Sequence, residues 1–312
     1  MGDIVLSIFM TTFNHESYIK QALDSILIQK TRYSYEVLVG DDLSKDSTRE
    51  ILRLYEKRYP EKFKMFYREQ NMFKKSPDNA SDLMMRCKGK YIIALEGDDF
   101  WLDPKKIDTQ IKFLENHPEY IAVAHNCIVV DRDSKVLDES YPECKEEDYT
   151  LKHFVSEIMP GQYTTILYRN IFRMKHIDTS LLFKGLVPGD RLLYFVLTTH
   201  GKVCCLQKVM SAYRHVKDNG TSYSAMYKYN YGEMEEWYRN LVEYSRNLRH
   251  KEAEKYAEVL YVRNLLQGLK RKQCNIFGVL RGLRKIKHKK RSLFLWGIYK
   301  INKDIRHKSI WL

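Results

Sequence analysis

The sequence predicts an α/β protein with a mainly parallel sheet flanked by helices and a basic, helical C-terminal extension. Over residues 1–130, short apolar runs alternate with amphipathic stretches, which is the pattern of parallel strands joined by crossover helices. Polar residues follow these runs where strands would end, and open α/β sheets bind ligands at that edge. Later in the chain, apolar residues recur at helical spacing. We therefore expect one domain at residues 1–222 and a helical region at residues 223–312.

Each expected element depends on the spacing of its apolar residues. Apolar runs predict strands at residues 4–9, 35–39, 64–67 and 91–95, and then at 163–168, 203–206 and 209–214. Helical spacing predicts helices around three groups: Tyr18, Ala22, Ile26 and Leu27; Ile51, Leu52, Tyr55 and Tyr59; and Met234, Trp237, Leu241 and Tyr244. Another helix is expected to begin near Asp190.

Composition indicates a globular protein of a reducing compartment. The 312 residues are 44% hydrophobic, enough for a large core. The six cysteines form no C-x-x-C pair, as expected for reduced thiols. The N-terminus lacks the features of a secretory signal, and no apolar run reaches the roughly 18 to 20 residues that a spanning helix needs. We therefore expect a cytoplasmic protein.

The net charge of +13 lies in one segment. Residues 270–312 hold 14 of the 53 Lys and Arg but only one of the 40 acidic residues, Asp304, so residues 1–269 are neutral. A pI of about 9.2 leaves a nucleic-acid-binding protein as an alternative. Because the charge is confined to one tail and no nucleic-acid-binding module accompanies it, we expect no nucleic-acid partner.

An apolar run at residues 91–95 leads directly into three carboxylates, Glu96, Asp98 and Asp99. Clustered carboxylates repel one another, and a hard divalent cation with oxygen ligands relieves the repulsion. The segment therefore suggests a metal site at a sheet edge. The alternative is a solvated acidic turn that closes the strand and caps the helix after Pro104.

Four segments carry a family resemblance. They are residues 7–14 (SIFMTTFN) with Tyr18 and residues 22–29 (ALDSILIQ); residues 39–48 (VGDDLSKDST); Asn79 with residues 89–92 (GKYI); and residues 96–99 (EGDD). In this order they resemble the glycosyltransferase family 2 enzymes of the GT-A (Rossmann-like) fold, over about residues 4–216. The resemblance implies a nucleotide-binding half at residues 1–130, an acceptor-side half at residues 131–222, and transfer of a hexosyl or N-acetylhexosaminyl group from a UDP-sugar.

The resemblance also implies which residues bind the nucleotide. They are Thr11, Phe13, Asn14, Asp42 and Asp98. Phe13 would offer a ring face to the uracil, Thr11 would contact the nucleoside, and the carboxylate of Asp42 would accept a hydrogen bond from the base. The alternative for Asp41 and Asp42 is capping of the next helix, although Asp46 or Ser47 could be the N-cap itself.

The metal is expected to be Mn²⁺ or Mg²⁺, held by Asp98 and Asp99 against the diphosphate, where it would neutralise the charge of the UDP leaving group. Glu96 stands where the family usually has Asp, and we expect it at the donor sugar or behind the metal ligands. Trp101 would be either a platform for the sugar or part of the core.

Two more residues are expected at the phosphates. Arg214 and His215 lie in a segment similar to the one after the family's last strand, and either could contact the diphosphate. A histidine near a strand end is also commonly structural.

Residues 185–193 resemble the family segment that supplies the catalytic base, which makes Asp190 the candidate. It would deprotonate the acceptor hydroxyl for a single displacement that inverts the anomeric carbon. The alternative for Asp190 is a helix N-cap, and the positive end of the helix is expected to lower its pKa. Many family members have Glu where this chain has Gly189, which removes one potential helper.

The basic tail suggests a membrane surface. Residues 276–286 place Ile276, Val279, Leu280, Leu283 and Ile286 on one helical stripe, and the cations of residues 287–291 precede aromatic residues. This mixture suits an anionic bilayer, to which residues 270–312 would attach the protein at the inner face of the cell membrane. The acceptor would then be a glycan on a polyprenyl diphosphate, in the synthesis of a bacterial surface polysaccharide such as O-antigen or capsule. The alternative is a basic face packed on its own domain.

Two other classes remain as alternatives. Another UDP-sugar-dependent enzyme or a nucleotidyltransferase could use a similar sheet, but those commonly carry a glycine-rich basic loop after the first strand. Residues 10–14 contain neither glycine nor lysine. An inactive scaffold is the other class, against which Asp42, Asp98, Asp99 and Asp190 argue together.

Overall fold

The computed structural model describes residues 4–216 and 229–288. The chain divides into two compact units, Met1–Tyr149 with Met159–Ala225, and Thr150–Ile158 with Met226–Leu312. The second unit thus takes in a short segment that the sequence assigned to the first domain. Within that unit, α5 (Leu151–Val155) packs on α9 (Lys251–Lys270), and Glu157 forms an ion pair with Arg263 at 2.8 Å.

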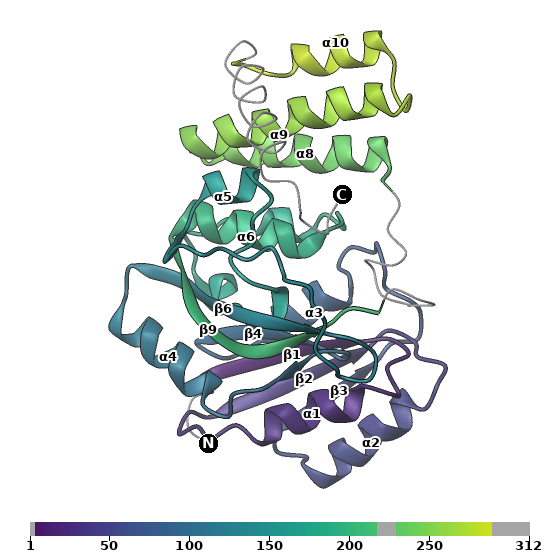
Figure 1. The fold of residues 1–312 in the computed structure, drawn as a ribbon, viewed down its shortest axis with the longest axis vertical. Helices are drawn as coiled ribbons and strands as arrows, with labels where there is room; N and C mark the ends of the chain where they lie inside the picture. Colours follow the sequence, from purple (N-terminus) through teal and green to yellow (C-terminus); the bar gives the residue numbers. More distant parts are fainter. Residues whose placement is uncertain (1–3, 217–228, 289–312) are drawn as a thin grey trace. The chain divides into compact units, whose positions relative to one another are not determined.

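The first unit contains one nine-stranded mixed sheet (Figure 1). Its parallel part has the order β3 (Phe63–Tyr67), β2 (Tyr35–Asp41), β1 (Leu6–Thr12), β4 (Tyr91–Glu96). The order continues through β8 (Leu167–Arg169), β6 (Tyr120–Val130), β9 (Lys202–Arg214) and β5 (Phe100–Trp101), with β7 (Asp148–Tyr149) paired to β9. β8 runs antiparallel to both neighbours, and β9 runs parallel to β6.

Helices cover both faces of this sheet. They are α1 (Ile19–Leu27), α2 (Thr48–Arg58), α3 (Asn79–Arg86), α4 (Lys106–Asn116) and α6 (Gly189–His200), with short 3₁₀ turns η1 (Tyr163–Thr165), η2 (Ile171–Arg173) and η3 (Ser180–Phe183). The chain moves from β1 to β2 to β3 and then returns to β4, so right-handed crossovers put α3 on the face opposite α1 and α2. The predicted α/β class is confirmed.

The second half of the sheet differs from the sequence expectation. The two strands expected at residues 203–206 and 209–214 are one strand, β9, because Gln207 and Lys208 form a bulge: His125 pairs with Leu206 and Asn126 with Val209. The strand expected at 163–168 is a 3₁₀ turn followed by β8. β6 is a long strand that the apolar pattern did not single out.

The second unit is helical in its described part, as expected. α8 (Tyr231–Asn247) buries Met234, Trp237, Leu241 and Tyr244, the four residues at helical spacing. α9 packs against α8 and α10 (Ile276–Arg284). Among residues 4–216 and 229–288, no helix has both the length and the apolar character needed to cross a membrane. The cations at 289–291 and the aromatic residues after them lie outside the described residues.

Candidate active site

The carboxyl ends of three neighbouring strands meet at one edge of the sheet. In the register, Thr11 of β1 lies opposite both Gly40 of β2 and Glu96 of β4. The backbone continues this pairing beyond the strands, since the Asp42 N–H donates to the Thr12 carbonyl (2.9 Å) and the Gly97 N–H to the Thr11 carbonyl (3.0 Å). Three loops that are distant in sequence are therefore held side by side.

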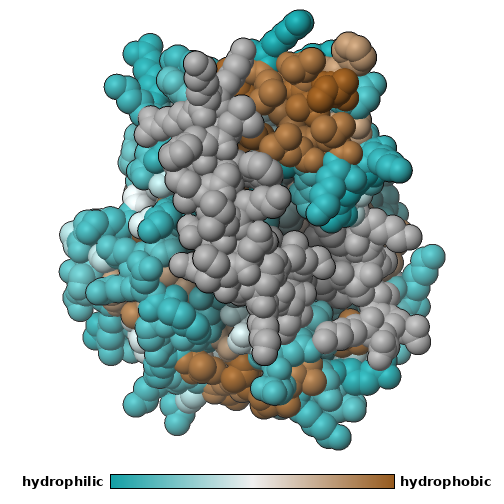
Figure 2. Space-filling view, turned by 45° about the horizontal axis from the view of Figure 1, so that its top comes forward, coloured by the Kyte–Doolittle hydropathy of each residue, from teal (hydrophilic) through white to brown (hydrophobic). Residues whose placement is uncertain are grey.

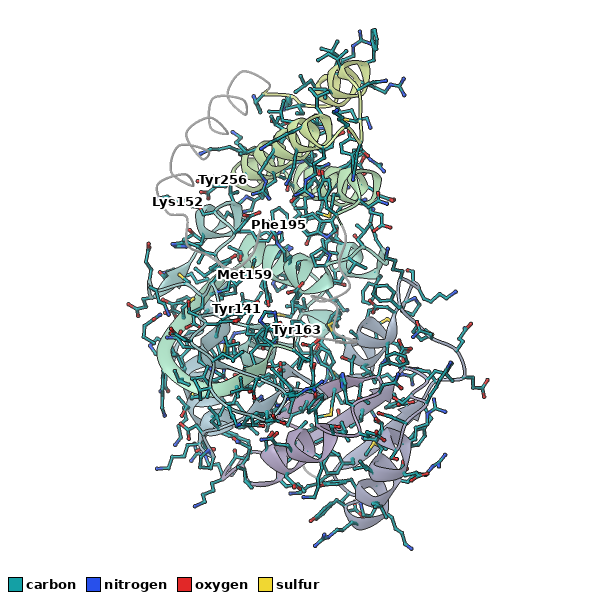
Figure 3. The ribbon with its side chains drawn as sticks, turned by 45° about the vertical axis from the view of Figure 1, so that its right-hand side comes forward. Tyr141, Lys152, Met159, Tyr163, Phe195 and Tyr256 are labelled. Atoms are coloured by element: carbon teal, nitrogen blue, oxygen red, sulfur yellow. The ribbon has the colours of Figure 1, made fainter. Side chains whose placement is uncertain are left out.

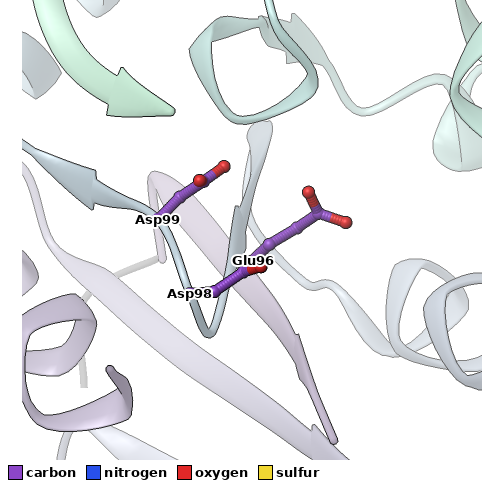
Figure 4. A group of neighbouring side chains, drawn as sticks. All are labelled: Glu96, Asp98 and Asp99. Carbon is purple, nitrogen blue, oxygen red and sulfur yellow. The ribbon is translucent and has the colours of Figure 1, made fainter. Parts of the chain in front are cut away.

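Glu96, Asp98 and Asp99 form an acidic cluster at this edge (Figure 4). One carboxylate oxygen from each lies within 4.8 Å of the others. The tight turn that gathers them is closed by the Asp99 N–H, which donates to the Glu96 carbonyl (3.1 Å). These carboxylates do not cap α4, whose first turn is held instead by Asp103, which accepts from the Lys105 N–H (2.8 Å).

Asp99 is the anchored member of the cluster. Its carboxylate is buried and accepts from the Gln162 side chain (2.9 Å) and from the Arg214 N–H (2.8 Å). The Arg214 guanidinium donates to the Asp98 carbonyl (2.8 Å), to Gln21, and to the carbonyls of residues 131 and 132. Arg214, which we expected at the diphosphate, is therefore buried among protein acceptors and holds the acidic turn in place.

Burial and the charges of neighbouring carboxylates raise the pKa values of Glu96 and Asp99. The pKa of Glu96 is raised to about 8 by burial, then by the charges of Asp98 and Asp190. Burial also raises the pKa of Asp99, and the charges of Asp98 and Glu96 add to the effect. A site with this much uncompensated negative charge is disfavoured unless a cation or protons neutralise it.

The donor set fits a hard divalent cation. Three carboxylates supply only oxygen ligands, which is the preference of Mg²⁺ and Mn²⁺. Asp98 and Glu96 are partly accessible to solvent, whereas Asp99 is buried. Among the three, Asp98 and Glu96 are therefore the side chains that an ion could reach from solvent, and Asp99 adds negative charge next to them.

Asp41 and Asp42 differ sharply in their surroundings. Asp41 is buried and accepts from the Ser44 N–H (3.1 Å) and from Arg49, so it holds the loop after β2. Asp42 is only half-buried, accepts from the Met72 N–H (2.6 Å), and has its pKa raised by burial. Neither caps α2.

The capping role belongs to the other two candidates. Ser47 occupies the N-cap position of α2, and Asp46 accepts from the Thr48 N–H (3.0 Å). Of the two aspartates after β2, Asp42 is therefore the one with capacity for a ligand.

The loop after β1 is shaped by Asn14. This residue has a φ of 54°, a left-handed conformation that asparagine tolerates better than most residues. Its N–H donates to Ser44 (2.9 Å), and its side-chain oxygen accepts from the Lys45 N–H (2.8 Å). Asn14 thus joins the β1 loop to the β2 loop, between which Thr11 and Phe13 remain partly accessible.

His15 is a site residue that the sequence analysis missed. Its Nε2 lies 3.9 Å from an Asp98 carboxylate oxygen, and its Nδ1 lies 3.2 Å from the Thr12 hydroxyl. Gly97 makes this approach possible, because a Cβ there would lie 2.6 Å from the Thr12 hydroxyl and 2.8 Å from His15 Nδ1. The only sequence signal was a histidine directly after the polar loop of the first strand.

Trp101 and His215 also have protein partners. Trp101 is 1% exposed in β5 and packs in the core, with the Lys106 amine 4.3 Å from its ring centre, which favours the core interpretation over a sugar platform. His215 Nδ1 lies 2.9 Å from Glu139, and the ring stacks on Tyr213. Both residues therefore have a structural explanation in the described part of the chain.

Asp190 lies in the first turn of α6, close enough to Glu96 to raise its pKa. The N-cap of this helix is Pro188, so the Asp190 carboxylate is not the cap. The N–H groups at the start of the helix lower its pKa, as expected, but the net shift is upward. Burial raises the pKa of Asp190 and outweighs the lowering by the N–H and the charge of Arg191.

Two tyrosines lie near both carboxylates. The charges of Asp190 and Glu96 act on the side chains of Tyr141 and Tyr163, whose pKa values are raised first by burial. Figure 3 labels both tyrosines, above the strands of the first unit. Asp190 thus shares an enclosed environment with the acidic cluster.

Solved structures with the same fold are known. The crystal structure of residues 1–349 of S. aureus TarS in complex with UDP-GlcNAc matches with a TM-score of 0.63, covering 95% of this chain and 80% of TarS, at 17% identity. The complex of the same fragment with UDP matches with a TM-score of 0.59. These similarities confirm the predicted GT-A fold.

Sequence relatives are also known. Rv1520 of Mycobacterium tuberculosis, an uncharacterized protein, is 30% identical over 209 residues, which are 67% of this chain and 58% of Rv1520. EpsE of Bacillus subtilis, proposed to be a glycosyltransferase, is 29% identical over 188 residues, or 57% of this chain and 66% of EpsE. TuaG of the same organism, proposed to act in teichuronic acid biosynthesis, is 31% identical over 110 residues, or 35% of this chain and 42% of TuaG. The chain spans less than two thirds of the length of these relatives.

A family model identifies the family to which this chain belongs. The family model described as glycosyl transferase family 2 matches residues 7–171, which is more than half of the chain. The chain belongs to glycosyl transferase family 2, and the family predicted from its motifs is confirmed.

Proposed function

We propose that this protein transfers a sugar from a UDP-sugar to a hydroxyl group of a glycan acceptor, with inversion at the anomeric carbon. The observation that carries the proposal is the cluster of Glu96, Asp98 and Asp99 beside the strand ends that bear Thr11 and Asp42, with Asp190 close to Glu96. The complex of TarS with UDP-GlcNAc supports the donor class.

On the donor side, Asp42 accepts a hydrogen bond from the uracil, and Phe13 covers the face of the base. The half-buried carboxylate of Asp42 suits this role, because Asp41 is already committed to the loop. Asn14 acts by holding the β1 and β2 loops together. Thr11 contacts the nucleoside at the strand end.

Asp98, together with Glu96, is the group that would bind Mn²⁺ or Mg²⁺, and Asp99 supports them from the buried side. When bound, the cation would neutralise the negative charge that develops on UDP as it leaves. His15 lies beside Asp98 and orients its carboxylate.

Asp190 is the base. Its carboxylate takes the proton of the acceptor hydroxyl as the hydroxyl oxygen forms a bond to the anomeric carbon. The bond from that carbon to the UDP oxygen breaks at the same time, and its electron pair leaves with UDP. Burial raises the pKa of Asp190, which makes it a stronger base than a solvated aspartate.

The acceptor is a glycan held at the membrane, such as one on a polyprenyl diphosphate, in the synthesis of a surface polysaccharide. Two observations support this part of the proposal. Residues 270–312 carry all the excess positive charge, which suits attachment to the anionic inner face of the cell membrane. The relative TuaG is proposed to act in teichuronic acid biosynthesis.

A panel of UDP-sugars scored for UDP release tests the proposal. We expect release that needs a divalent cation and an acceptor, and a fall of at least about 10²-fold in kcat for Asp190→Asn. Asp133→Asn, an exposed aspartate of the same unit, is the matched control and should keep full activity. A product with retained anomeric configuration would overturn the inverting mechanism, and release without any cation would overturn the metal role.

A further inference from the structure

The helix α10 uses only part of its apolar surface to pack on the second unit. Val279 is buried, as is Ile286 just after the helix, and a Cβ at Gly282 would collide with the Leu265 side chain of α9. Lys285 adds an ion pair with Glu235 at 3.1 Å. Only part of the predicted apolar stripe of residues 276–286 is therefore buried, on the side of α10 that faces α9.

The other side of α10 is exposed and apolar. Ile276 is 53% exposed, Phe277 73% and Leu280 50%, and they lie on one side of the helix because they are at positions i, i+1 and i+4. Figure 2 shows apolar side chains gathered in a patch where α10 lies. We call Ile276, Phe277 and Leu280 the outer face of α10.

Positive charge surrounds this outer face. Residues 270–288 contain seven Lys or Arg and no acidic residue. Arg281 and Arg284 extend from α10 itself and are exposed, as are Arg271 and Lys272 before it. Apolar side chains flanked by cations are the pattern of a helix that lies in the interface of an anionic bilayer.

We propose that the outer face of α10 inserts into the surface of an anionic membrane, with Phe277 as its most exposed side chain. The inference rests on the proposed attachment of residues 270–312 to the membrane, and it identifies the side chains that enter the lipid. It also changes the sequence interpretation, because Val279 and Ile286 are occupied by the second unit and only the outer face is available.

Charge decides between a bilayer and the other possible occupants of this face. A second copy of the chain would bring Arg281 and Arg284 against the same two cations. Residues 289–312 also carry seven Lys or Arg and one acidic residue, so they repel the face as well. Anionic lipid has the opposite charge and an apolar interior, and therefore complements both features.

The test is vesicle binding by the full chain with two matched pairs of substitutions. Phe277→Ser with Leu280→Ser removes apolar surface from the outer face without changing charge. Leu54→Ser with Val136→Ser removes side chains that are 67% and 66% exposed on the first unit. Binding to phosphatidylglycerol vesicles is measured by flotation at low and high salt.

We expect the outer-face pair to reduce partitioning by about tenfold or more, since lipid binding scales with inserted apolar area, and the control pair to leave it unchanged. The residual binding should be lost at high salt, because it depends on charge alone. In Phe277→Trp, brominated lipids should quench the added fluorescence. Thermal unfolding should be unaffected, because these side chains are exposed.

The vesicle experiments distinguish failure of the outer-face inference from failure of the proposed membrane attachment. If the outer-face pair binds as tightly as the wild type, the inference fails but charge-driven attachment of residues 270–312 survives. If the wild type does not bind anionic vesicles at all, both fail. Concentration-dependent self-association that the outer-face pair abolishes would assign the face to a second copy instead.

Discussion

Glu36 and Glu96 lie on strands that both pair with β1, at opposite ends of the same sheet. Glu36, near the start of β2, accepts from the Ser7 hydroxyl (2.8 Å), the Lys88 N–H (3.0 Å) and the Lys64 amine (2.7 Å). Although burial raises the pKa of Glu36, these three donors lower it overall. Glu96, at the end of β4, faces other carboxylates, and its pKa is raised to about 8.

The contrast between Glu36 and Glu96 shows how a buried charge that stabilises the fold differs from one that is available to a ligand. At the amino end of the strands, a buried carboxylate has all the donors it needs, so it contributes to folding. At the carboxyl end, three carboxylates are gathered without enough positive charge, which is unfavourable for folding but suits a cation and a substrate. The folded state tolerates this because Arg214 and Gln162 hold the turn rigidly.

The largest effect is expected for Asp98→Asn. It removes one of the two partly accessible carboxylates of the cluster, so metal-dependent UDP release should fall by about 10²-fold to 10³-fold. Stability should stay the same or rise, because one repelling charge is lost. The rise in melting temperature that Mn²⁺ causes in the wild type should disappear.

Activity assays and thermal unfolding with and without Mn²⁺ measure these effects, with Asp133→Asn as the control. An Asp98→Asn protein that is less stable than the wild type would mean that the cluster stabilises the fold, as Glu36 does. The comparison between the two ends of the sheet would then be wrong.

Glu36→Gln should have the opposite outcome. It leaves the Lys64 amine without its partner and weakens the bond to the Lys88 N–H, so the free energy of unfolding should fall by about 2 kcal/mol. Because Glu36 is far from the acidic edge along the strands, kcat should remain near the wild-type value below the melting temperature. Urea unfolding and UDP release measure the two quantities. A large loss of kcat in a folded Glu36→Gln protein would contradict the assignment.

The difference in stability between the wild type and Glu36→Gln should depend on pH. The folded-state pKa of Glu36 is lowered, so its contribution is fully present above the unfolded pKa of about 4.3 and is lost as the pH falls through the folded pKa. The stability gap between wild type and Glu36→Gln should therefore be constant from pH 7 to about 5.5 and shrink below about 4.3. Urea unfolding across this range checks it, and a gap that widens in acid would show that the sign is wrong.

The smallest effect is expected for Tyr194→Phe. Tyr194 lies one turn after Asp190 on α6, is 1% exposed, and its hydroxyl has no hydrogen-bond partner among the described residues. Removing a buried hydroxyl that lacks a partner should raise the free energy of unfolding by about 0.5–1 kcal/mol. Urea unfolding measures this. A destabilised variant would show that the hydroxyl is hydrogen-bonded in solution. Tyr194 would then be, like Glu36, a buried polar residue whose partners stabilise the fold.

The first half of the fold was predictable because its strands and helices follow from patterns among residues that are close together in the sequence. Apolar runs and helical spacing identify β1 to β4, α1 and α2, and the three polar loops follow from where those strands end. The second half was harder, since β9 continues through a bulge at the polar pair Gln207 and Lys208, which in sequence looks like a turn. β8 is only three residues long and is defined by pairing with β4 and β6.

The candidate site was also only partly predictable from the sequence. The motifs identified the acidic cluster and Asp42, but sequence could not distinguish a residue that faces the ligand from one that supports it. Arg214 was expected at the diphosphate, and Trp101 either at the sugar or in the core. Both are buried, because their partners come from distant segments. His15 was missed because its approach to Asp98 depends on Gly97, 82 positions later in the chain.

Residue type and local spacing were enough to predict the family, the α/β class, the acidic strand end and the segregation of positive charge into one tail. The contacts of the folded chain were needed to establish which carboxylates are partnered, whether burial or a helix end governs the pKa of Asp190, and which side of α10 remains exposed. The physical reason is that burial and hydrogen bonding depend on groups brought together from distant parts of the chain, and the free energy of a charged or apolar side chain depends on those neighbours.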